Sequence, residues 1–187
     1  MKSFFDDARE WAEGRLPFLR LVLLIYLGYA WVRHLGNPMY GSWFDMLNLG
    51  IHELGHFVFM PFGRFLEIAG GSIFQCLVPV ISIFIFYRQR DYFAIAISFG
   101  WLSTNFFDVA TYIADARYTN LPLVSPFGAC DVVHDWNWLL SRMGMLKSCW
   151  AIARWVRIMG SLSMLICLLF GGWLVWCMFR TLKDNRK

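Results

Sequence analysis

Charged residues are scarce in this chain of 187 residues: Asp, Glu, Lys and Arg make up 16% of it, against 58% hydrophobic residues. Soluble domains carry about a quarter charged residues, so the composition excludes an ordinary soluble enzyme. A membrane-crossing helix needs about 20 mostly apolar residues, and several stretches approach that length. The expected solvent of most of the chain is therefore the lipid bilayer.

Cysteine pairs are also missing. The five cysteines are odd in number and show no CxxC spacing, which argues against a disulfide framework and against a cysteine zinc site. The formal charge of +4 comes from 17 Lys and Arg against 13 Asp and Glu, and the basic residues gather at the ends of apolar segments. This placement suits anionic lipid headgroups and argues against a nucleic-acid partner.

A removable signal peptide is not expected either. The first 15 residues mix acidic with basic side chains, and no small-residue cleavage site follows the first apolar run. We expect that run to be a membrane anchor, and we expect a multi-pass integral protein of a bacterial cytoplasmic (inner) membrane.

The apolar runs predict an all-α polytopic membrane protein with a single membrane domain over residues 1–187. We expect an interfacial amphipathic helix within 1–15 and a polar loop plus helix within 114–147, near the active site. That helix is predicted over 132–145, with Asp131 as its cap. Between Gly63 and Ser72, the adjacent Gly70 and Gly71 predict a short re-entrant strand or hairpin after the second span. Five transmembrane helices are predicted, near 16–32, 44–62, 73–87, 92–113 and 158–179.

The predicted orientation contains a conflict. The head and the tail of the chain carry four basic residues each: Lys2, Arg9, Arg15, Arg20, and Arg180, Lys183, Arg186, Lys187. Five crossings would place these two groups on opposite sides, whereas basic residues normally collect on the cytoplasmic side. One of the five segments is therefore expected to be re-entrant or misassigned.

The strongest chemical signal is His52-Glu53-Leu54-Gly55-His56, inside the second apolar segment. On a helix, His52 and His56 lie about 40° apart, so both imidazoles can reach one ion. Two imidazoles can hold Zn²⁺ and leave places for a third ligand and a water, from which the adjacent Glu53 can take a proton. The motif predicts a zinc cofactor with His52 and His56 as metal ligands and Glu53 as the catalytic general base.

A structural interpretation competes with the metal site. The two histidines and Glu53 can instead cross-link neighbouring helices by hydrogen bonds. A carboxylate at the centre of a membrane helix costs about 2.5–3.5 kcal/mol on insertion scales, so either interpretation requires a partner or a wet cavity.

In these residues the chain resembles the site-2-protease class of intramembrane zinc metalloproteases. The resemblance rests on the histidine motif and on Gly70-Gly71-Ser72 with Gln75 and Pro79, and it extends over residues 44–140. It implies that His52 and His56 bind zinc, that Glu53 is the general base, that a membrane-embedded strand follows, and that a later aspartate completes the metal site. The family's Asp-Gly pair is absent, which leaves the third ligand open.

Four residues compete to be that third ligand, and one of them, Asp131, is better explained as a helix cap. His134 ranks first, since it is able to bind zinc directly with Asp135 orienting it; Asp135 itself ranks second. Asp108 ranks third, as a carboxylate inside another span with Asn105 one turn earlier. Each also has a structural interpretation: His134 and Asp135 as ordinary polar residues at a helix start, and Asp108 as the partner of a neighbouring helix.

The function predicted from the sequence is an intramembrane zinc metalloprotease. It would hydrolyse a peptide bond of a membrane-protein or peptide substrate, in or near the bilayer, with zinc-activated water and Glu53 as general base. Gly70 and Gly71 would then flank a strand edge that holds the substrate, or would instead allow close helix packing. The alternatives are a metal-dependent membrane hydrolase of a non-peptide substrate and a non-enzymatic membrane scaffold with a structural polar cluster.

Overall fold

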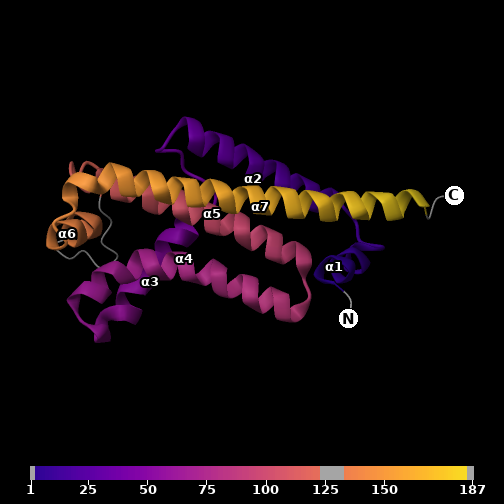
Figure 1. Ribbon diagram of the computed structural model, residues 1–187, viewed down its shortest axis with the longest axis horizontal. Helices are drawn as coiled ribbons and strands as arrows, with labels where there is room; N and C mark the ends of the chain where they lie inside the picture. Colours follow the sequence, from indigo (N-terminus) through magenta and orange to yellow (C-terminus); the bar gives the residue numbers. More distant parts are fainter. Residues whose placement is uncertain (1–2, 123–132, 185–187) are drawn as a thin grey trace. The chain divides into compact units, whose positions relative to one another are not determined.

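A computed structural model describes residues 3–122 and 133–184, and every regular element in these ranges is a helix (Figure 1). The predicted all-α class is therefore confirmed. Two short 3-10 turns, Met60–Phe62 and Leu146–Ser148, join neighbouring helices. The helices are α1 (Phe4–Ala12), α2 (Phe18–Gly36), α3 (Asp45–Phe59), α4 (Arg64–Gln89), α5 (Tyr92–Asp115), α6 (Asp135–Arg142) and α7 (Cys149–Asp184).

Four helical stretches of the described chain are long and apolar enough to cross a membrane: Phe18–Gly36, Arg64–Gln89, Tyr92–Asp115 and Leu146–Lys183. They correspond to four of the five predicted spans. The remaining predicted span, over 44–62, corresponds to α3, which is not one of these four stretches. With 15 residues, α3 is about 22 Å long, which is short of a bilayer core of about 30 Å.

The prediction of a short re-entrant strand or hairpin between Gly63 and Ser72 is wrong. Gly63 has a φ of 94°, which ends the preceding turn, and the chain then enters α4 at Arg64 and stays helical to Gln89. A glycine in a helix costs about 1 kcal/mol relative to alanine. The close packing of Gly70 and Gly71 against α3 offsets that cost.

The chain divides into two compact units. The terminal unit consists of Met1–Asn37, Pro79–Ser103 and Ser161–Lys187, and the central unit consists of Pro38–Val78 and Thr104–Gly160. Helices α4, α5 and α7 contribute to both. Each unit is described by itself below.

In the terminal unit, α1 forms the predicted helix near the N-terminus. Ser3 and Asp6 make a capping box at its start, and Ala8 and Ala12 are fully buried. The Phe4 ring lies 5.2 Å from Tyr92 and 5.6 Å from Phe170. The α1 helix is therefore attached to the start of α5 and to α7; its position at a membrane interface stays a prediction.

The two ends of the described chain meet in this unit. The ring of Phe18 in the first turn of α2 lies 5.9 Å from that of Phe179 near the end of α7. Crossing by these four candidate helices, an even number, would return the chain to the side on which it started. The basic residues at the head of the chain and at the end of α7 would then share one side, and the conflict that five spans create with the positive-inside rule would not arise.

The central unit packs α6 onto α5 and the start of α7. Its buried core comprises Val109, Ile113, Ala116, Leu140, Cys149 and Ala153. The helix predicted over 132–145 is shorter than expected, because His134 occupies the capping position and the helix begins at Asp135. Gly144, with a φ of 68°, follows its end. Asp131, the predicted cap, lies outside the described residues.

Candidate metal centre

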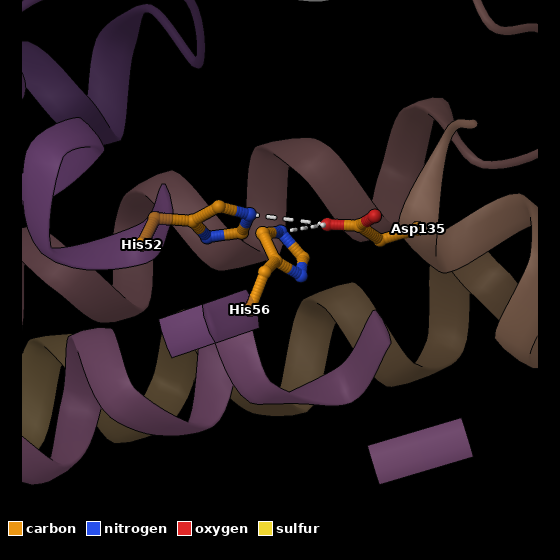
Figure 2. A group of neighbouring side chains, drawn as sticks. All are labelled: His52, His56 and Asp135. Carbon is orange, nitrogen blue, oxygen red and sulfur yellow. Dashed lines mark hydrogen bonds and ion pairs between the residues drawn. The ribbon is translucent and has the colours of Figure 1, made fainter. Parts of the chain in front are cut away.

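Helix α3 brings His52 and His56 to one side, as their spacing predicts, and the Asp135 carboxylate faces both rings (Figure 2). The Nε2 atom of His52 lies 3.1 Å from Asp135 Oδ2, and that of His56 lies 3.3 Å from the same oxygen. All three ligand atoms lie within 4.8 Å of one another. Side chains from two adjacent turns of α3 thus contact the side chain of the first residue of α6.

The opposite nitrogen of each imidazole is held by α4. The Nδ1–H of His56 donates to the backbone oxygen of Glu67 at 2.8 Å, and Nδ1 of His52 lies 3.0 Å from Gln75 Oε1. A carbonyl oxygen only accepts, so Nδ1 carries the hydrogen and Nε2 carries the lone pair in the neutral ring. This arrangement is typical of histidines that bind metals, whose second nitrogen donates to an oxygen that fixes tautomer and ring orientation.

Asp135 is positioned by contacts of α6 with α4 and α5. Its backbone N–H donates to the hydroxyl of Tyr112 at 3.2 Å. The next residue, Trp136, donates its indole N–H to Ser72 Oγ at 3.0 Å, and the Asn137 amide donates to the Ala116 carbonyl at 2.7 Å. These bonds to both neighbouring helices fix the carboxylate opposite the histidines.

Two imidazole nitrogens and a carboxylate oxygen therefore converge on one point, where a proton on Nε2 or a metal cation can lie between them. Burial acts to lower the pKa of His56, but the hydrogen bond and the negative charge of Asp135 outweigh it, so the pKa is raised. Burial likewise acts to raise the pKa of Asp135, but its bonds to His52 and His56 leave that pKa lowered.

The two nitrogen–oxygen spacings of the site suit zinc. Ligands about 2.0–2.1 Å from a tetrahedral Zn²⁺ are about 3.3–3.4 Å from one another. The observed nitrogen–oxygen distances of 3.1 and 3.3 Å lie close to that edge length. An N₂O donor set leaves a fourth position for water, as in catalytic zinc sites.

Glu53 lines the same cavity as the three candidate ligands, and its side chain is half-buried. The cavity has a volume of about 670 Å³ and lies within the central unit. Tyr112 also lines it, with its ring 6.0 Å from that of His52. A carboxylate and a phenol therefore border the space next to the proposed metal position.

The other two candidates for the third ligand have different partners. Nδ1 of His134 accepts the backbone N–H of Asn137 at 3.2 Å, and Nε2 lies 3.3 Å from Asp115 Oδ2. Its ring centroid lies 4.3 Å from that of Tyr112, with the two ring planes tilted by 35°, and burial lowers its pKa. Asp108 lines the cavity but accepts a hydrogen bond from the Asn48 amide at 2.7 Å. The geometry therefore favours Asp135, which ranked second from the sequence.

The two glycines of α4 permit the close approach of α3. A Cβ on Gly71 would stand 2.5 Å from Nε2 of His52 and 2.7 Å from Nε2 of His56, and a Cβ on Gly70 would stand 2.6 Å from that of Phe59. A Cβ on Gly55 would collide with the Gly70 carbonyl oxygen. Of the two roles considered for Gly70 and Gly71, close packing is the one that their helical backbone supports.

Several residues of the site were not singled out as site residues from the sequence. Tyr112 carries no motif of its own. Ser72 and Gln75 belong to the segment that carries the family resemblance, but no role in the site was assigned to them. Asn48 precedes His52 by one helical turn, so a search for polar residues at this spacing would have found it.

Comparisons with known proteins add no relative. No family model matches this chain, and no curated protein or solved structure matches it. Its chemistry must therefore be inferred from the residues and their geometry.

Proposed function

We propose that this protein is a membrane-embedded zinc metallopeptidase, in which His52, His56 and Asp135 hold the metal and Glu53 is the general base. The observation that carries the proposal is the convergence of two Nε2 atoms and one carboxylate oxygen beside Glu53 in one cavity. The choice of peptide hydrolysis as the reaction rests on the resemblance of the motif region to the site-2-protease class.

A zinc ion bound at these three residues would supply a Lewis acid that polarises a carbonyl group and lowers the pKa of water. Glu53 would accept the proton of the attacking water and deliver it to the leaving amine. Tyr112 accepts the Asp135 N–H through its oxygen, so its own O–H can donate to a substrate oxygen. The chain's own groups would thus move the proton and orient the substrate.

The cavity wall beside these groups suits an apolar peptide. It includes Met39, Met46, Leu49, Phe57 and Met60, and methionine adapts its shape to varied side chains. A segment of a membrane protein offers such side chains. This lining supports a substrate that lies in the bilayer or enters from it.

Removal of the metal tests the proposed activity. Membranes that contain the protein should generate new peptide termini, and a zinc chelator should stop their formation until Zn²⁺ is added back. Terminus-selective mass spectrometry makes the measurement. A chelator-sensitive change confined to lipids would favour the non-peptide hydrolase, and the absence of any chelator-sensitive product would favour the scaffold.

The choice of third ligand is tested by metal affinity. Asp135→Asn should weaken zinc binding by about 10- to 100-fold, because an amide oxygen carries no charge. His134→Asn retains a capping side chain and should leave the affinity within about twofold, as should Asp108→Asn, which keeps its volume in the cavity wall. Zinc titration of the purified chain, with metal content by elemental analysis, makes the comparison.

A different ranking of these variants would contradict the assignment. Normal affinity in Asp135→Asn together with a large loss in His134→Asn would make His134 the ligand. Unchanged zinc affinity in all three variants would show that none of the three replaced residues is the third ligand.

A further inference from the structure

Two arginines of the terminal unit lie against one tryptophan. The guanidinium carbon of Arg15 lies 4.2 Å from the ring centroid of Trp11, and that of Arg20 lies 5.7 Å from the same ring. Arg20 also lies 5.6 Å from the ring of Phe93. Two positive charges are thus gathered on one indole, at the junction of α1 and α2.

Each guanidinium is anchored by one hydrogen bond to a backbone oxygen. Arg15 Nε donates to the Trp11 carbonyl at 2.7 Å, and Arg20 Nη1 donates to the Leu16 carbonyl at 2.6 Å. A guanidinium has five N–H groups, and these are the bonds that both arginines make in the part of the chain that the structure describes. The side chains are held in place while several donors of each stay available to an anion.

Exposed apolar side chains surround this pair. Leu16 is 64% exposed, Phe18 is 58% exposed and Leu19 is 84% exposed. Phe18 and Leu19 begin a helix that is long and apolar enough to cross the membrane, and Leu16 lies two residues before it. In a bilayer, this combination places apolar side chains among acyl chains and the guanidinium groups at the level of the headgroups.

We propose that Trp11, Arg15 and Arg20 form a binding site for the phosphate of an anionic phospholipid. Two guanidinium groups match the negative phosphate in charge and in hydrogen-bond donors. A zwitterionic headgroup brings its own cation close to the arginines, so an anionic headgroup binds better. The exposed side chains of Leu16, Phe18 and Leu19 contact the acyl chains. The site is independent of the metal centre, which lies in the central unit.

The adjoining basic side chains strengthen this preference. Arg88 lies in the last turn of α4, and Arg90 lies in the turn that leads to α5. Tyr87 of α4 and Tyr92 of α5 both contact Phe4 of α1. Arg180 follows Phe179, whose ring contacts Phe18. Anionic lipids are therefore concentrated at this end of the terminal unit, and the arginine pair selects one phosphate among them.

The test is a lipid titration of the intact protein in nanodiscs, followed by mass spectrometry of the released complexes. Phosphatidylglycerol should be retained in preference to phosphatidylcholine. Arg15→Gln/Arg20→Gln should weaken phosphatidylglycerol binding by about 10- to 30-fold. The matched control is Arg33→Gln/Arg142→Gln, which removes the same charge and two arginines that also lie over aromatic rings, at 5.7 Å from Tyr29 and 5.3 Å from Trp138. Its effect should stay below about threefold.

Each other outcome overturns the proposal. Equal losses in the two double variants would show a general effect of charge. Competition by inorganic phosphate at the same concentration as the lipid would show a site for free anions. A lower melting temperature with unchanged lipid retention in Arg15→Gln/Arg20→Gln would show that the arginines serve only the fold.

Discussion

Replacing Glu53 by glutamine should lower proteolysis by about 10²- to 10⁴-fold while the bound zinc is retained. General acid–base catalysis contributes a factor of that size, and glutamine keeps the shape of glutamate but accepts no proton. Glu53 is separate from the three candidate ligands, so metal content should stay at the wild-type level. The measurement is the membrane proteome of a strain whose own gene is deleted and which carries either the wild-type chain or the variant: an uncleaved membrane protein should accumulate with Glu53→Gln.

Glu67→Gln is the matched control for this variant. Glu67 lines the same cavity, but its carboxylate pairs with Arg64 at 2.9 Å, and its backbone oxygen is what holds His56. Proteolysis should therefore stay within about twofold of the wild type, since a surface ion pair contributes little. Full proteolysis by Glu53→Gln, or an equal loss of proteolysis in the two variants, would show that Glu53 is not the general base.

Adding one methyl group at Gly71 should abolish most metal binding without unfolding the protein. The new Cβ would stand 2.5 Å and 2.7 Å from the two Nε2 atoms, and the rings can move aside only by leaving Gln75 or Glu67. We expect Gly71→Ala to weaken zinc binding by at least about 100-fold, because both ligands move together. The loss of stability should stay near 1 kcal/mol, at the low end for overpacking, since the displaced atoms are side-chain tips.

Two other glycines separate the metal effect from a general packing effect. A Cβ on Gly50, inside α3, meets nothing within 4 Å, so Gly50→Ala should leave the zinc affinity unchanged and raise stability by up to about 1 kcal/mol, whereas a Cβ on Gly55 meets the backbone of Gly70. Gly55→Ala should mainly lower the melting temperature, because backbone cannot rotate aside. Zinc titration and thermal unfolding of the three variants make the comparison. Normal zinc affinity in Gly71→Ala would contradict the geometry of the site.

The long helices were predictable because an apolar run longer than a bilayer is an unambiguous pattern. Residues 44–62 were harder to interpret. Their composition suits a span, but Pro61 and Gly63 end the helix early, and the glycines at 55, 70 and 71 reflect contacts between α3 and α4. Sequence periodicity carries no information about such contacts. A glycine pair inside a helix and one inside a hairpin therefore look alike.

The candidate site was predictable where its members share one helix. His52, Glu53 and His56 follow from a fixed spacing on α3. The choice between the adjacent His134 and Asp135 depends on where α6 begins, because one residue of shift turns a side chain by about 100°. Asp131, His134 and Asp135 are all able to cap a helix or to follow a cap, so the sequence alone does not decide which of them faces α3.

The contacts that α4 makes with the histidines set a rule for recognising related sequences. The Glu67 carbonyl, Gly71 and Gln75 follow one another at intervals of four residues on a single helical face. An insertion or deletion between positions 67 and 75 would rotate one of these groups away from its ring. The turn at 60–63 faces no such constraint and can vary in length. Distant relatives should therefore keep the histidine motif, a glycine, and a glutamine four residues after that glycine, with gaps confined to the turn before α4.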